Sequence, residues 1–167
     1  ESSGPISNGP GMLHYGRLFD EIIKRAGART IVFMTWARQD QPQAQSQVVS
    51  AYRELGRHLG ARVAPVGTSW IKALESKPEI RLYAPDQSHA APLGAYLAAR
   101  VFFGIFFGNA SPNFPSSLEE VERLMPSPRD GAFGSLPEHL RFLDSVARSC
   151  VVEELGVQGR PRDQVFI

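Results

Sequence analysis

Apolar residues near the start of the chain recur at the spacing of one helix face. They stand three or four positions apart at Met12, Tyr15, Phe19, Ile22 and Ala26. Because this spacing lines one side of an α-helix, and Gly27 follows where a left-handed helix end is favoured, the pattern predicts an amphipathic helix that ends there. Residues 30–36 (TIVFMTW) form a short run rich in β-branched and aromatic side chains. Such a run predicts a strand that is buried on both faces.

Helices and short apolar runs continue to alternate up to residue 107. The predicted elements are a helix from Pro42 that ends at Gly60, a strand over residues 62–65, a short helix capped by Thr68 and Ser69, a strand over residues 81–83, and a helix over residues 93–107 that Pro92 begins. Helices that alternate with buried strands imply crossovers between parallel strands, with helices on both faces of the sheet. The sequence therefore predicts a three-layer α/β/α fold with a parallel sheet.

The composition changes beyond Gly108, where prolines interrupt the chain and no strand pattern appears. Ser117 and Glu120 have the spacing of a capping box, which predicts a helix there. A second stripe at helical spacing is formed by Leu136, Leu140, Leu143, Ala147 and Cys150. We expect residues 1–155 to form one domain with a helical extension from about residue 109, and residues 156–167 to be a polar tail.

The predicted sheet is narrow for a domain with so many helices. Only three strands are predicted, whereas sheets commonly have about five or six. The chain also begins with Glu1 rather than Met. We therefore expect the fold to start part-way through a domain and to lack one or more N-terminal strands.

Charge and cysteine content narrow the classes of function. The 167 residues include 18 Lys plus Arg and 17 Asp plus Glu, a formal net charge of +1, with no run of basic residues. We therefore expect no nucleic-acid partner and no binding to an anionic membrane. Residues 93–107 are the most apolar segment, but Arg100 interrupts them and they are shorter than the roughly 20 residues that span a membrane. The single cysteine, Cys150, excludes an intrachain disulfide framework.

Metal and nucleotide cofactors are not expected. His14, His58, His139 and Asp40 do not show the spacing of metal ligands. No glycine-rich loop that could cradle a phosphate follows the first predicted strand. A flavodoxin-like nucleotide binder is therefore the least favoured of the functions that this fold class suggests.

Asp86 and His89 are the first candidates for chemistry. They lie in a loop between a predicted strand and a predicted helix, and open α/β sheets bind ligands beyond the carboxyl ends of their strands. Because they stand three positions apart on a turn, the carboxylate can orient the imidazole and stabilise its protonated form, so that His89 would act as a general base. The alternative is that Asp86 only caps the turn and His89 is an ordinary surface histidine.

Trp36 and Arg38 directly follow the first predicted strand and are candidates for the lining of a substrate cleft. An indole offers a flat apolar platform for a sugar ring, and a guanidinium can pair with a carboxylate or hold an acyl carbonyl. The alternative is that Trp36 belongs to the core and Arg38 to the surface.

The loop and the strand before it resemble conserved blocks of the SGNH/GDSL hydrolase family. Residues 84–97 (APDQSHAAPLGAYL) read as D-x-x-H-x-x-P-x-G-x-Y-L, which is similar to the last conserved block of that family. Residues 30–38 (TIVFMTWAR) resemble a strand of the family, and residues 108–112 (GNASP) with 136–143 (LPEHLRFL) resemble the C-terminal end of bacterial members. The likeness extends over residues 4–151.

The resemblance implies a flavodoxin-like fold and a serine esterase or acyl hydrolase with a Ser-His-Asp triad. His89 would be the base and Asp86 its orienting acid, and the candidate substrate is a small-molecule or carbohydrate ester. The family carries its nucleophile in an N-terminal G-D-S or G-N-S block, which this sequence does not contain. The serine is therefore expected upstream of Glu1. Residues 1–5 (ESSGP) resemble the tail of the third block of the family, which would place Ser2 or Ser3 near the oxyanion hole. The alternative is that both are solvated serines near the terminus.

A second class of function stays open beside the enzyme. The chain can keep the fold without catalysis and use the cleft at the strand ends for binding. A G-D-S or G-N-S segment upstream of Glu1 in the parent reading frame distinguishes the two. By family resemblance, a secreted or periplasmic location is compatible with the sequence.

Overall fold

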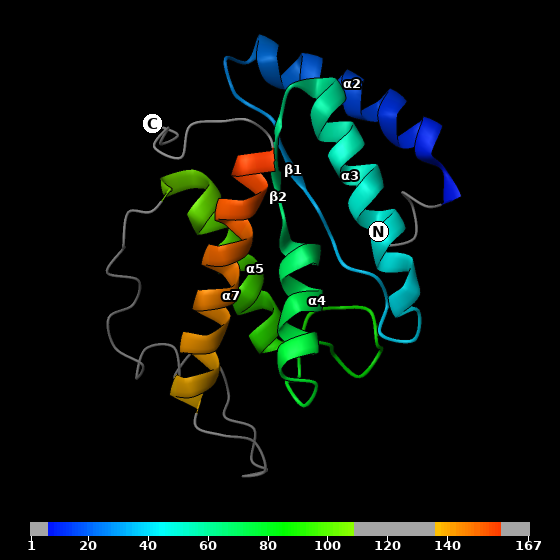
Figure 1. Cartoon of the computed structure of the whole chain (residues 1–167). Coiled ribbons are helices and arrows are strands. Elements are labelled where there is room, and N and C mark those ends of the chain that lie inside the picture. The colour runs from blue at the N-terminus through cyan, green and yellow to red at the C-terminus, as the bar shows by residue number, and fades with distance from the viewer. Residues whose placement is uncertain (1–6, 109–135, 158–167) are drawn as a thin grey trace.

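The computed structural model describes residues 7–108 and 136–157, which form two short strands and five α-helices with one turn of 3-10 helix (Figure 1). The elements are α2 (Gly9–Arg25), β1 (Ile31–Phe33), η1 (Pro42–Ala44), α3 (Gln45–Leu59), β2 (Arg62–Ala64), α4 (Val66–Ser76), α5 (Pro92–Phe107) and α7 (Leu136–Val157). This part of the chain is mostly helical, with some α/β character.

The two strands are parallel, as the sequence predicts for residues 30–36 and 62–65. Ile31 pairs with Arg62 and Phe33 with Ala64. The amide of Met34 continues the ladder by donating to the carbonyl of Ala64 at 3.1 Å. Helix α3 connects the strands and lies on one side of them, while α5 and α7 lie on the other side (Figure 1). The pairing of a strand with the next strand along the chain through a helix is the unit that the alternating pattern implied.

The third predicted strand, residues 81–83, is not a strand of this sheet. Tyr83 instead forms an isolated antiparallel bridge with Ala90. The carbonyl of Leu82 accepts from the amide of Ala91 at 2.8 Å, and the amide of Ala84 donates to the carbonyl of His89 at 2.9 Å. Because its backbone groups are satisfied by the loop that follows, the segment folds back on itself. Sheet pairing between β1 and β2 is therefore all that the described residues show of the predicted parallel sheet.

Helix ends follow the sequence at some positions and not at others. Gly60 ends α3 in the left-handed conformation, with φ of 62°, as a terminal glycine favours. Helix α4 begins at Val66 after Pro65, so Thr68 and Ser69 lie inside the helix and do not cap it. The hydroxyl of Ser69 donates to the carbonyl of Pro65 at 2.9 Å. The predicted cap was wrong because the helix begins before these residues and their hydroxyls bond elsewhere, that of Ser69 to Pro65 and that of Thr68 to the sulfur of Met34 at 3.4 Å.

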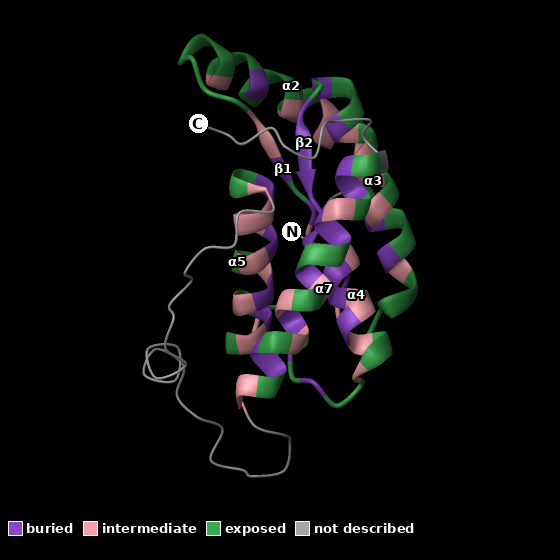
Figure 2. Ribbon diagram, turned by 60° about the vertical axis from the view of Figure 1, so that its left-hand side comes forward, coloured by how far each residue is buried: buried purple, intermediate pink, exposed green. Residues whose placement is uncertain are grey.

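The main core lies between β2 and the helices α4, α5 and α7. Leu97, Val101 and Ile105 of α5 are fully buried and belong to the same cluster as Leu143 and Ala147 of α7. Figure 2 shows these buried faces turned toward one another across the molecule. A smaller cluster joins β1 and β2 to α3. The predicted stripe of the last helix is confirmed as a core face, and the helix runs on to Val157.

Helix α2 exposes much of its apolar stripe. Four large side chains on this face are exposed, namely Tyr15, Leu18, Phe19 and Ile22. The opposite side of the helix faces α3 and holds the buried carboxylate of Asp20, which accepts hydrogen bonds from Thr30 and Lys24. The predicted helix is present, but polar contacts hold it to the rest of the described chain.

Some predictions concern residues outside the described ranges. The capping box at Ser117 and Glu120, residues 158–167 of the predicted tail and the serines Ser2 and Ser3 lie there. The first two residues of that predicted tail, Gly156 and Val157, belong instead to helix α7. Of the helices in the described ranges, none combines the length and hydropathy that crossing a membrane requires.

Candidate active site

Asp86 and His89 lie in a loop that closes on itself and rests on the segment after β1. The backbone bridge between Tyr83 and Ala90 closes the loop. The amide of Gln39 donates to the carbonyl of Gln87 at 2.9 Å, which ties the loop to the chain that leaves β1. Figure 1 shows the green loop before α5 next to this blue segment. The loop therefore lies beyond the carboxyl end of β1, where parallel α/β folds place their ligands.

The turn is built by the side chain of Asp86. Its Oδ1 atom accepts hydrogen bonds from the amide of Ser88 at 3.0 Å and from the amide of His89 at 2.9 Å. Gln87, which lies between Asp86 and Ser88, has a φ of 60°, in the left-handed region that a residue other than glycine seldom occupies. The carboxylate thus holds a turn that the backbone would not favour unaided.

The second oxygen of the same carboxylate contacts the imidazole. Asp86 Oδ2 lies 2.5 Å from Nδ1 of His89. This hydrogen bond, together with the two backbone amides, holds the pKa of Asp86 well below its usual range. Because an ionised carboxylate can only accept, Nδ1 carries the proton, and Nε2 is the acceptor of the neutral ring. The His89 side chain is 84% exposed, so incoming groups can reach it.

Asp86 therefore does what both sequence-based alternatives describe. It caps the turn through Oδ1, and it orients the imidazole through Oδ2. A histidine held in one tautomer by a carboxylate, with its other nitrogen open to solvent, can take a proton from a hydroxyl or a water molecule. No serine in the described ranges is hydrogen-bonded to it.

Family models, curated proteins and solved structures were compared with this chain, and none matches it. The geometry of the residues is therefore what supports a function.

Trp36 lies beside the loop with one face covered. Its ring stacks on that of Trp70, with centroids 3.9 Å apart and planes inclined by 6°. Its indole Nε1 donates to the carbonyl of Ser88 at 2.9 Å. Trp70 is 1% exposed and belongs to the main core. The indole of Trp36 is thus partly buried, and its N–H edge contacts the loop of the candidate site.

Arg38 is also close to the loop, since the next residue, Gln39, bonds to Gln87. Its guanidinium pairs with Asp40, with Nε 3.1 Å from Oδ1. The side chains of Arg38 and Asp40 are both partly exposed to solvent. The proposed contact of Arg38 with an acyl or carboxylate group stays a prediction, as do the roles of Ser2 and Ser3.

Tyr83 and Gln45 support the site, a role that the sequence pattern did not indicate. The phenol of Tyr83 donates to the carbonyl of Ala37 at 2.7 Å, and the side chain of Gln45 accepts from the amide of Ala37 at 2.7 Å. Together they hold the segment that carries Trp36 and Arg38. Tyr83 lay in a predicted strand and Gln45 in a predicted helix, and neither position carries a local signal for such a contact.

The described ranges contain no cluster of three or more His, Cys, Asp or Glu side chains that could hold a metal ion. His58, for example, is occupied by its own helix, with Nδ1 2.9 Å from the carbonyl of Glu54.

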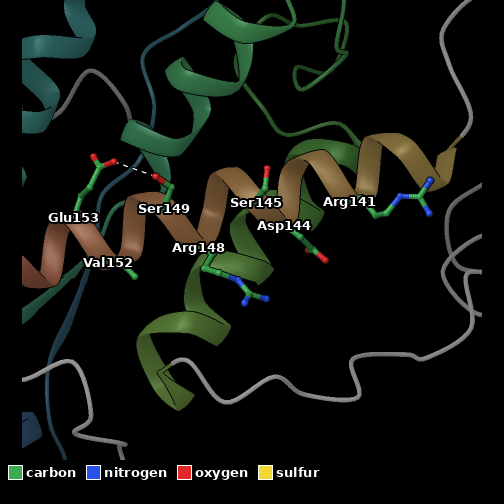
Figure 3. A pocket seen from close by; sticks show the side chains of 7 residues that line it. All are labelled: Arg141, Asp144, Ser145, Arg148, Ser149, Val152 and Glu153. Carbon is green, nitrogen blue, oxygen red and sulfur yellow. Dashed lines mark hydrogen bonds between the residues drawn. The ribbon is translucent and has the colours of Figure 1, made fainter.

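A hollow of about 540 Å³ lies elsewhere, along the outer face of α7 (Figure 3). It is lined by Arg141, Asp144, Ser145, Arg148, Ser149, Val152 and Glu153. Its acidic groups are already paired, Asp144 with Tyr96 and Glu153 with Lys72. Because the lining contains neither Asp86 nor His89, this hollow is separate from the candidate active site.

Proposed function

We propose that this chain carries the histidine and aspartate of a serine acyl hydrolase of the SGNH type. The observation that carries the proposal is the Asp86–His89 pair, with 2.5 Å between Oδ2 and Nδ1, at the end of β1 and with the imidazole exposed. The parallel pairing of β1 and β2 and the position of the loop before α5 agree with the resemblance to that family. The proposal includes a three-layer α/β/α fold, in which further parallel strands complete the sheet.

The proposed reaction uses a serine from a segment that precedes Glu1 in the parent protein. As the serine oxygen attacks the ester carbonyl carbon, His89 Nε2 takes the hydroxyl proton, and a tetrahedral oxyanion forms. His89 then gives this proton to the leaving alcohol as the ester bond breaks and an acyl-enzyme remains. Water attacks the acyl-enzyme with His89 again as base, which releases the acid and restores the serine.

Asp86 contributes through charge and orientation. Its carboxylate stays ionised because three hydrogen bonds favour the charged form, so it stabilises the imidazolium that forms during the attack. Trp36 and Arg38 border the same loop, which is compatible with an ester of a small molecule or of a carbohydrate as substrate.

The test is ester hydrolysis by the parent protein that includes the upstream serine segment. His89→Ala should lower kcat/KM for p-nitrophenyl acetate by about 10³-fold or more, since it removes the group that is proposed to take the serine proton. Asp86→Asn should cost about 10⁴-fold, as the corresponding change does in serine proteases with a Ser-His-Asp triad. The double variant should be little worse than His89→Ala, because the two groups act as a unit.

His58→Ala is the matched control, because His58 is also exposed but is bonded only within α3. It should keep normal kcat/KM. The 167-residue chain by itself should show negligible hydrolysis. If folded His89→Ala retains near-normal kcat/KM, the assignment of His89 as base is wrong.

A non-catalytic binding domain is the second candidate. In that case the parent protein should bind an acylated sugar in calorimetric titration without hydrolysing it. Turnover of the ester by the wild-type parent excludes this candidate.

A further inference from the structure

The peptide bond that leads into His89 is held at both of its polar atoms. Its carbonyl oxygen, on Ser88, accepts from the indole Nε1 of Trp36 at 2.9 Å. Its amide, on His89, donates to Oδ1 of Asp86 at 2.9 Å. Because the peptide group is planar, two hydrogen bonds at opposite ends of this plane restrict its rotation. The direction in which the His89 side chain leaves the backbone follows from that plane.

The donor at the carbonyl end is itself held rigidly. The ring of Trp36 stacks on Trp70, which is almost completely buried in the main core. The carbonyl of Ala37, next in the chain, accepts from Tyr83, and the amide of Ala37 donates to Gln45. The indole N–H therefore connects the exposed turn to the packed interior of the molecule.

The turn needs such support because it is strained and exposed. Gln87 adopts a φ of 60°, and the side chains of Asp86 and His89 are half exposed and almost fully exposed. Only two hydrogen bonds from the segment after β1 reach the turn in the described structure, one from Trp36 and one from the amide of Gln39. An exposed turn with so few contacts would otherwise sample several orientations.

We infer that Trp36 is a positioning residue, which fixes the peptide plane before His89 through its indole N–H and thereby keeps the imidazole against Asp86. The catalytic consequence rests on the function proposed above, whereas the positioning itself does not. The face of the indole contributes to packing on Trp70. The N–H contributes to the site, and the two contributions can be separated by substitution.

The first arm of the test measures the positioning without any substrate. Trp36→Phe removes the N–H and keeps an aromatic face toward Trp70. The ¹³C titration of the Asp86 carboxyl should then move upward, toward the ordinary value of about 3.9, because a looser turn weakens the hydrogen bonds to the charged form. If the titration is the same as in the folded wild type, the inference is overturned.

Two further variants keep this arm decisive. Leu143→Ala removes a fully buried side chain of α7 and should lower stability without moving the titration of Asp86. Replacement of Trp36 by β-(3-benzothienyl)alanine keeps the two fused rings and lacks only the N–H, so it serves if Trp36→Phe does not fold. This replacement should shift the titration as Trp36→Phe does, and no shift would contradict the inference.

The second arm measures catalysis in the parent protein. A misplaced base should lower kcat by about 10²-fold or less while KM changes little, because the N–H that Trp36→Phe removes bonds to the turn that carries the base, and an aromatic face is kept. A rise in KM with normal kcat would instead make Trp36 a substrate contact and overturn the inference. If His89→Ala stays active but Trp36→Phe still shifts the Asp86 titration, the proposed function fails and the positioning role holds.

Discussion

Single residues of the loop perform more than one task. Asp86 uses one carboxylate oxygen to close the turn and the other to orient His89. Tyr83 closes the base of the loop through its backbone bridge to Ala90, and its phenol donates to the carbonyl of Ala37. Burial of this phenol raises its pKa to about 12, because the charged phenolate is poorly solvated there. The geometry of the loop is thus sensitive to the ionisation of groups that do no chemistry.

The titration of Tyr83 gives a prediction at the residue scale. A tyrosine titrates near 10 in the unfolded chain. The free energy of unfolding should therefore fall as the pH rises from about 10 to about 12, because the unfolded chain loses this proton first. The absorbance at 295 nm of the wild type minus that of Tyr83→Phe should therefore rise with a midpoint near 12. The same difference measured in denaturant should have its midpoint near 10. A midpoint near 10 in the folded protein would show that the phenol is not desolvated.

Helices α3 and α7 are joined by an ion pair between residues far apart in sequence. Arg53 reaches Glu154 with both Nε and Nη2, the shortest distance being 2.7 Å. The Glu154 side chain is 1% exposed, while that of Arg53 is 41% exposed. A buried carboxylate is costly without a partner, so this pair ties α7 to α3 across the two elements.

Removal of Arg53 gives a prediction at the scale of elements. Arg53→Leu should destabilise the protein by about 2 to 3 kcal/mol, less than for a fully buried pair because one partner is solvated. The double variant Arg53→Leu with Glu154→Leu should recover part of this loss. Lys72→Leu is the control, since Lys72 of α4 pairs with Glu153 of α7 and both of these side chains are exposed. It should change stability by about 1 kcal/mol or less in urea unfolding. Equal losses for Arg53→Leu and Lys72→Leu would contradict the prediction.

Burial is distributed unevenly over the whole molecule. Helix α5 contributes three fully buried side chains to the main core, whereas the buried side chain of α2 is the carboxylate of Asp20. Gly16 of α2 lies against Leu55 of α3, and Lys24 reaches the carbonyl of Leu59. Within the described ranges, α2 is therefore attached by a few polar contacts and a small packing surface.

Hydrogen exchange tests this difference at the scale of the molecule. The amides in the middle of α2 should exchange at least about tenfold faster than those of α5, because opening α2 exposes little buried apolar surface. Exchange followed by mass spectrometry or NMR on the same sample provides the comparison, with α7 as a second reference. Equal protection of α2 and α5 would mean that α2 is held by contacts that its burial does not show.

The sequence by itself determined features that depend on near neighbours. The spacing of apolar residues located the helices and the two parallel strands, because helix and strand periodicities are properties of local backbone geometry. Gly60 marked the end of α3 for a similar reason, since its left-handed conformation is a local preference. The three-residue spacing of Asp86 and His89 likewise sufficed to predict their contact, because the contact forms within one turn.

Only the tertiary structure decided which distant groups meet. Residues 81–83 had a strand pattern, but their hydrogen bonds went to the loop that follows, a choice that local propensity cannot make. The contacts of Trp36 with Ser88 and of Arg53 with Glu154 join residues 52 and 101 positions apart. Such contacts depend on how the helices pack around the sheet. For this reason the candidate base could be found in the sequence, while the side chains that hold it in place could not.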